Sequence, residues 1–207
     1  MRKYLLILIF CLSAFTSFGQ AEIGIKFSPS ISANRVSTDS DSLTYSNDGT
    51  GLRFVFGVIL DLPLTEKYYF STGLLYSPER AAIVLDNLDQ QEAYKTQYLQ
   101  IPITVKLFTE ELFLDTKLFF QIGLVGEIKV TDKEEDVSNE LVESFRAVDT
   151  SLTLGAGFER NFGVANVWFA GFSYSRGLVN IVSDSNSNFD DFSIKNDMYQ
   201  IDLGIKF

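Results

Sequence analysis

The sequence predicts an all-β fold, an eight-stranded antiparallel up-and-down transmembrane β-barrel with short periplasmic turns and long extracellular loops. Seven segments alternate large apolar residues with small or polar ones, and a weaker eighth stands near the front. Period-two alternation places the two residue kinds on opposite faces of a strand. The connections alternate between short and long, and the last segment ends on Phe207. These three observations are typical of barrels that cross a membrane with strands.

The first residues predict export. Arg2 and Lys3 precede an apolar run from Tyr4 to Phe15, and small residues follow at Ser17 and Gly19. This order is typical of a cleavable export signal. The run is shorter than the about 20 apolar residues that a membrane-spanning helix needs. We therefore expect residues 1–19 to be a signal peptide that is removed, and residues 20–207 to form one outer-membrane β-barrel domain.

The eight strands follow one another along the expected mature chain. They are predicted at 22–33, 51–62, 68–77, 95–108, 117–129, 150–160, 167–177 and 197–207. Short connections are predicted at 63–67, 109–116 and 161–166, and long ones at 34–50, 78–94, 130–149 and 178–196. Residues 80–85 are compatible with an extension of the third strand above the membrane. Sorting of short turns to one rim and long loops to the other favours a bacterial outer-membrane barrel with both termini in the periplasm.

The two parities of the strands carry different chemistry. One parity is bulky and apolar and is expected to contact lipid: Leu52, Phe54, Phe56, Val58, Leu60, Leu62, Leu99, Ile101, Ile103, Val105, Leu107, Leu118, Phe120, Ile122, Leu124, Ile128, Trp168, Ala170, Phe172 and Tyr174. The other parity is expected to fill the interior with glycines and polar groups: Gly24, Gly57, Gly73, Gly123, Gly155, Gly157, Gly171, Gly204, Gln100, Gln121 and Gln200. A soluble barrel shows the opposite arrangement, with apolar residues inside.

Charged residues share the interior parity. The candidates for ion pairs in the lumen are Lys26, Arg53, Asp61, Lys106, Glu127, Glu159, Asp202 and Lys206. An eight-stranded barrel is just wide enough for side chains to pack inside. We therefore expect a filled, partly hydrated lumen and no sizeable pore. Two carboxylates can catalyse glycoside hydrolysis, but nearby cations make structural ion pairing the favoured interpretation.

Closure requires the first and last strands to meet, because unpaired backbone groups are costly in hydrocarbon. Residues 22–27 and 199–207 are the candidates. Aromatic residues cluster at the predicted short-turn rim, as expected for a membrane interface: Tyr68, Tyr69, Phe70, Phe108, Phe113, Phe162, Trp168 and Phe207.

Composition excludes several functions. The chain contains no His, and its one cysteine, Cys11, lies within the expected signal. Catalytic pairs that need His, and His-rich or thiolate metal sites, are therefore excluded. A net charge of −10 and a pI near 4.5 argue against nucleic acid or an anionic surface as a partner. We expect no catalytic residue, no cofactor and no resident metal.

Several segments together resemble a known family. Residues 98–106, 123–126, 155–159 and 174–181, followed by the aromatic C-terminus, are similar in order and spacing to PorT-like, porin-family outer-membrane β-barrel proteins of Gram-negative bacteria. The resemblance covers the whole expected mature chain and implies insertion by the outer-membrane assembly machinery. It implies an assembly signal in the last strand, formed by Tyr199, Ile201, Leu203, Ile205 and Phe207. Some relatives serve a secretion system that supports gliding. The resemblance also suggests that Pro102 occupies a bulge near a rim.

The four long connections carry the excess negative charge. They hold five basic and seventeen acidic residues, a net charge of −12. Three interpretations stay open: a solvated, self-repelling rim; binding of divalent cations through 132–136 or 184–188; and recognition of a cationic partner or a polysaccharide. The segment 184–188 imitates the start of a calcium loop but is followed by Phe189 and Lys195 where Gly and Glu are required.

The favoured function is that of an integral outer-membrane protein with a structural or interaction role. Its partners are expected to be outer-membrane lipid, the assembly machinery, and secretion-system or surface components, with no nucleic acid. The alternative is a soluble exported, lipocalin-like ligand-binding barrel.

Overall fold

Eleven strands make up the secondary structure of the described part of the chain, which comprises residues 21–38, 45–46, 51–85, 90–136, 142–163, 166–185 and 192–207 of a computed structural model. The strands are β1 (Glu22–Thr38), β2 (Tyr45–Ser46), β3 (Gly51–Pro63), β4 (Tyr68–Leu85), β5 (Gln90–Phe113), β6 (Thr116–Asp136), β7 (Val142–Phe145), β8 (Val148–Phe162), β9 (Asn166–Gly177), β10 (Val182–Ser185) and β11 (Phe192–Lys206). These residues include no helix with the length and hydropathy to cross a membrane. The expected signal at 1–19 lies outside them.

Eight of these strands close into a barrel. The order is β1, β3, β4, β5, β6, β8, β9, β11, with every neighbouring pair antiparallel, and β11 returns to β1. The seam pairs Gly24 with Lys206 and Phe27 with Leu203. The predicted eight-stranded barrel and the meeting of its first and last strands are therefore confirmed. Closure gives the ladder a backbone partner on both sides of each strand, which is the requirement that hydrocarbon imposes.

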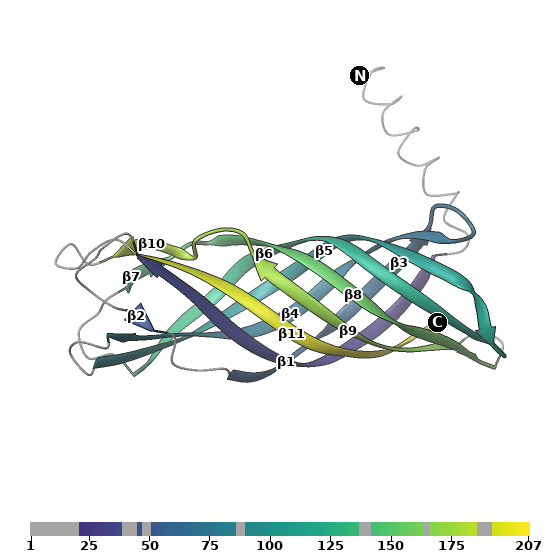
Figure 1. Cartoon of the computed structure of the whole chain (residues 1–207), viewed down its shortest axis with the longest axis horizontal. Helices are drawn as coiled ribbons and strands as arrows, with labels where there is room; N and C mark the ends of the chain where they lie inside the picture. Colours follow the sequence, from purple (N-terminus) through teal and green to yellow (C-terminus); the bar gives the residue numbers. More distant parts are fainter. Residues whose placement is uncertain are drawn as a thin grey trace, which may run out of the picture.

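The two ends of the barrel differ, as Figure 1 shows. The C-terminus and the tight connections after β3, β5 and β8 lie at one end, and β2, β7 and β10 lie at the other. Two turn residues have a positive φ, Asp115 at 58° and Gly163 at 76°. Asp and Gly are the residue types that tolerate this conformation in a short turn. The three predicted short connections thus share one end, as expected. At the other end, the predicted long loop at 78–94 was wrong, because β4 and β5 occupy most of it and only 86–89 join them.

The strands extend further at the long-loop end than the sequence predicts. β4 and β5 stay paired up to Leu85 with Gln90, so β4 continues through 78–85, about 27 Å past its predicted end at the usual rise per residue. The residues at 80–85 thus do extend β4. The short strands β7 and β10 pair with each other, and β2 pairs with β4. Strands β2, β7 and β10 were not predicted, because a strand that lies above the lipid has no need of an apolar outward face.

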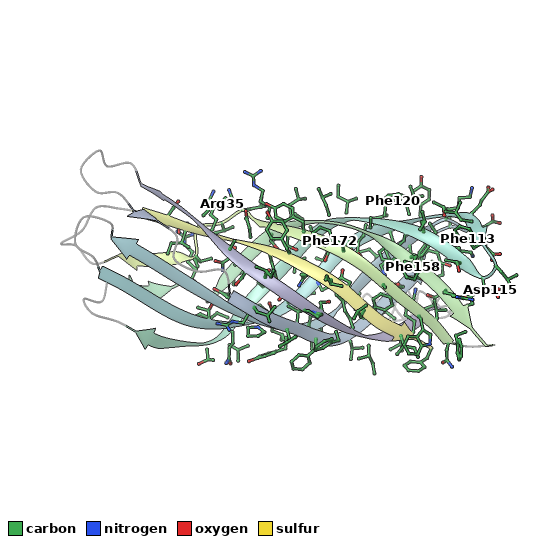
Figure 2. All side chains as sticks on the ribbon, turned by 60° about the horizontal axis from the view of Figure 1, so that its bottom comes forward. Arg35, Phe113, Asp115, Phe120, Phe158 and Phe172 are labelled. Carbon is green, nitrogen blue, oxygen red and sulfur yellow. The ribbon has the colours of Figure 1, made fainter. Side chains whose placement is uncertain are left out.

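The outward face is apolar and exposed along the middle of the barrel. Ile122 is 55% exposed on β6 and Ile103 is 55% exposed on β5, whereas Lys106 is 3% exposed. Figure 2 shows Phe120, Phe158 and Phe172 on the outer surface. Strands β1 and β3 carry this pattern over 23–31 and 52–60, close to the nine to eleven residues that a tilted membrane strand requires. This apolar outer surface does not favour the alternative of a soluble lipocalin-like barrel.

The lumen contains more apolar residues than expected. Phe108, Phe119 and Phe169 are 6%, 3% and 5% exposed and lie within one buried cluster. The other members are Val55, Ile59, Leu75 and Met198. Tyr69 packs against this cluster, its ring 5.0 Å from that of Phe108. The placement of Tyr69 and Phe108 in the outer aromatic rim was therefore wrong, since both occupy the inward parity of their strands.

Glycines make room for these rings. A Cβ on Gly157 would lie 2.7 Å from the ring of Phe119, and one on Gly204 would overlap the ring of Phe169. Contacts this short do not occur in real structures, so neither position has space for a larger residue. The glycines on the interior parity thus face buried rings and backbone, which is why the sequence alternates Gly with bulky outward residues.

Pro102 lies in the middle of β5, and the predicted bulge near a rim was wrong. It is buried on the lumen side and pairs with Val125 of β6. On the β4 side the ladder pauses between Ile103 and Gln100 and resumes in the same register. Proline lacks the N–H group that this ladder would use, so the strand gives up local pairing there and keeps its alignment.

Candidate functional site

Five charged side chains gather in the lumen near the periplasmic end, and we call them the lumen charge cluster. Lys206 Nζ lies 2.6 Å from Glu22 Oε2, 3.0 Å from Asp61 Oδ2 and 2.6 Å from Glu159 Oε2. Lys106 Nζ lies 2.7 Å from Asp61 Oδ2 and 3.8 Å from Glu159 Oε1. Ser71 also donates a hydrogen bond to Asp61. The cluster thus holds three carboxylates and two ammonium groups.

The members come from five strands, so the cluster links distant parts of the wall. Glu22 pairs with Asp61 across β1 and β3, and the other three stand on β5, β8 and β11. Lys106 Nζ also lies 5.3 Å from the ring centre of Phe119, within reach of a cation–π interaction. Buried charges are costly unless they are paired and hydrogen-bonded. Mutual pairing is therefore what permits Asp61 and Lys206, both 0% exposed, to remain inside.

Glu22 was missed by the sequence analysis. It occupies the same parity as Gly24 and Lys26, so the alternation of the first strand already placed it inside.

A second ion pair lies higher in the lumen. Lys26 Nζ is 2.9 Å from Asp202 Oδ1, and Ser28 Oγ donates to the same oxygen at 2.8 Å. The structure therefore brings six of the eight predicted lumen residues into ion pairs, four of them in the lumen charge cluster and two here.

Glu127 and Arg53 lie apart from both groups. Glu127 accepts hydrogen bonds from Gln100 and Ser151, each at 3.2 Å. Arg53 donates to the Leu52 carbonyl oxygen at 3.3 Å and forms no ion pair with a described carboxylate. Inward parity predicted that these two residues share the lumen, but it could not predict the partner of each.

The cavities among these side chains are small. One of about 40 Å³ lies between Lys26, Lys106 and Gln121, and one of about 70 Å³ lies near Glu22 and Glu159. Each has room for a few water molecules. A wider hollow of about 240 Å³ opens at the periplasmic end beside Phe207. The lumen is thus a packed interior with small hydrated gaps.

The carboxylates are arranged for pairing. Asp61, Glu159 and Asp202 each contact an ammonium group, although Glu159 Oε1 accepts no hydrogen bond from a described residue and has Lys106 Nζ at 3.8 Å. Within the described ranges, no three His, Cys, Asp or Glu side chains come together as a metal site. The two cation-binding candidates, 132–136 and 184–188, consist of residues whose side chains lie outside the described part.

The five residues of the predicted assembly signal all stand on the outward parity at the end of the chain. Tyr199, Ile201 and Leu203 are 45%, 56% and 42% exposed, and Phe207 is 60% exposed. The backbone N–H of Phe207 donates to the Ile23 carbonyl at 2.8 Å, so the terminus is fixed at the seam between the first and last strands.

Comparison with known proteins agrees with this architecture. The chain resembles the crystal structure of Neisserial surface protein A (NspA), at 10% identity over 90% of this chain and 95% of that one, with a TM-score of 0.53. It also resembles the solid-state NMR structure of outer membrane protein AlkL in DMPC lipid bilayers, at 10% identity over 90% and 88%, with a TM-score of 0.50. At such identities the likeness concerns the fold alone. No curated protein matches the chain.

A family model decides the assignment. The model described as outer membrane protein beta-barrel domain matches residues 15–183, most of the chain. The protein therefore belongs to this family of outer-membrane β-barrel proteins of Gram-negative bacteria.

Proposed function

We propose that the protein acts at the cell surface through its acidic extracellular loops, in a structural or interaction role, and not as an enzyme. The packed lumen is the observation that carries this proposal. Charged pairs and aromatic rings fill the described interior and leave cavities of about 40 and 70 Å³ between them. A barrel filled in this way offers its rims and outer wall for interaction.

The extracellular rim has the features of an interaction surface. Strands β4, β5 and β6 run well beyond the apolar band, and β2, β7 and β10 add further backbone structure there. The long connections carry a net charge of −12. Such a surface attracts cationic partners and speeds their encounter, and it keeps anionic ones away.

A role beside a secretion assembly that supports gliding is the finer part of the proposal. It is supported by the similarity of residues 98–106 and 174–181 to PorT-like proteins. Under this proposal the partners are secretion-system or surface components that contact the loops, in addition to lipid and to the machinery that inserts the barrel.

Site-specific photocrosslinking in intact cells tests the proposal. A photoreactive residue placed within 137–141 should capture a defined set of envelope proteins. Changing Asp132, Glu134, Glu135 and Asp136 to their amides should abolish that capture while the barrel still assembles. The matched control neutralises four acids at the opposite rim, Glu66, Glu110, Glu111 and Asp115, all exposed. Crosslinks that are unchanged by the outer substitutions would contradict the proposal.

A further inference from the structure

Three cations meet on the outer wall of the barrel at its extracellular end. Arg35 of β1 pairs directly with Lys195 of β11, and Asp197 of β11 pairs with Arg176 of β9. All four residues occupy the outward parity of their strands, the same as Ile31, Tyr199 and Tyr174. We call Arg35, Arg176 and Lys195 the outer cationic patch.

One carboxylate lies within the patch. Arg35 Nε donates to Asp197 Oδ2 at 2.8 Å, and the Arg35 side chain is 40% exposed. Arg35 Nη2 also donates to the Gly177 carbonyl at 2.8 Å, so its guanidinium is fixed. Arg176 is exposed and Lys195 is partly exposed. With Asp197 included, these side chains carry a net charge of +2.

Arg35 and Lys195 are like charges directly opposite each other. Such a pair destabilises a sheet unless an anion lies between or beside the two groups. Asp197 bonds Arg35, and Lys195 forms no ion pair with a described residue. The arrangement therefore leaves positive charge that a further anion would neutralise.

The surroundings of the patch point to lipid as the source of that anion. Just below it on the same face, the rings of Tyr174 and Tyr199 stack at 4.9 Å, and Phe172 stacks on Tyr199 at 6.4 Å. The Tyr174 hydroxyl donates to Asp197 Oδ2 at 3.0 Å, which ties the aromatic row to the patch. Figure 2 shows Arg35 on the extracellular side of Phe172. Tyrosines at this position mark the level of the lipid headgroups.

We propose that the outer cationic patch binds the phosphate group of an anionic lipid of the outer leaflet, with the acyl chains of that lipid lying along Phe172 and the exposed Ile201. The guanidinium group of arginine and the ammonium group of lysine are the side-chain groups that bind phosphate best. The chain is acidic as a whole, with a net charge of −10. Its expected avoidance of anionic surfaces therefore does not extend to this face, where the register gathers three cations.

Binding of fluorescent bisphosphorylated lipid A to the full barrel in neutral phosphatidylcholine nanodiscs tests this. The unaltered protein should bind it, and should bind the dephosphorylated lipid far more weakly. The double variant Arg176→Gln with Lys195→Gln should lose roughly twenty-five-fold in affinity, on the order of fivefold for each cation near an anionic lipid. The matched control is Arg160→Gln, an exposed arginine of the same parity at the other end of the barrel. It should leave the affinity unchanged.

Three results would overturn the proposal. These are equal binding of phosphorylated and dephosphorylated lipid, unchanged affinity in the double variant, and inorganic phosphate binding as tightly as the lipid, which would indicate a site for the free ion. Heat-modifiable gel mobility reports whether each variant is folded. If the double variant does not fold, Lys195→Gln alone removes a group that pairs with no described carboxylate, and it should still weaken binding about fivefold.

Discussion

Single glycines determine how closely neighbouring strands and lumen side chains approach each other. Gly123 and Gly126 stand on opposite faces of β6. A Cβ on Gly123 would overlap the Ile103 carbonyl oxygen and lie 2.5 Å from Thr104 Cα, whereas a Cβ on Gly126 would meet its nearest atom at 3.9 Å. The same residue type is therefore required at one position and incidental at the other.

Gly123→Ala should destabilise the barrel by about 1–3 kcal/mol, the usual cost of overpacking. Gly126→Ala should leave stability unchanged, because its Cβ would make only an ordinary van der Waals contact at 3.9 Å. Urea unfolding of the refolded proteins, followed by loss of the compact gel form, measures both. Equal effects of the two substitutions would contradict the packing described here.

Lys206 is the most connected residue of the lumen charge cluster. Lys206→Met should destabilise the barrel by about 3–5 kcal/mol, since it leaves buried carboxylates with fewer cations. Adding Glu159→Gln should restore part of the loss, because the two residues contact each other at 2.6 Å.

The control for Lys206 is Lys67→Met. Lys67 pairs with Glu110 at 3.0 Å, but their side chains are 52% and 84% exposed. The hydrogen bond from Lys67 lowers the pKa of Glu110 below its usual value. Solvent screens such pairs, so we expect no measurable change in the unfolding midpoint. A loss in Lys67→Met as large as that in Lys206→Met would refute the buried network as a source of stability.

At the level of strands, alternation predicted where each barrel strand lies but not how far it extends. The predicted strand at 95–108 became β5, Gln90–Phe113. A strand needs an apolar outward face only where it crosses the hydrocarbon layer. The apolar alternation therefore ends at the edge of that layer, while the hydrogen bonds between strands continue beyond it. Parity also placed the lumen charges inside. It could not predict which charges would pair, because the lumen contacts that join β3, β5, β8 and β11 depend on strand tilt and register.

The last strand provides a test of the predicted assembly signal. Phe207→Ala should lower the amount of folded barrel in the outer membrane, because the machinery is expected to recognise the outward residues of β11 together with Phe207, which follows it. Refolding in detergent micelles should be nearly unaffected, since Phe207 is 60% exposed. Phe113→Ala, at the last residue of β5, which is 76% exposed, is the control. Normal membrane levels of Phe207→Ala would refute the role of Phe207.

At the level of the whole molecule, the packed lumen predicts no sizeable conductance. Planar-bilayer recordings of the purified barrel should show no large, stable open channels, because eight strands enclose only side chains. Two of the cavities among those side chains hold about 40 and 70 Å³, and the wider hollow of about 240 Å³ opens at the periplasmic end. Large, regular openings would show that the interior rearranges to form a pore.

The central claim is that the apolar parity faces lipid, and cysteine scanning tests it most directly. The one native cysteine, Cys11, lies in the expected signal, so single cysteines can be introduced without competition. Fluorophores at Phe120, Phe158 and Phe172 should be quenched by brominated acyl chains and protected from aqueous iodide, while labels at the lumen-facing Gln121 and Ser173 should not be quenched by the brominated chains. Quenching of the outward labels by iodide, or of the lumen labels by brominated lipid, would contradict the account.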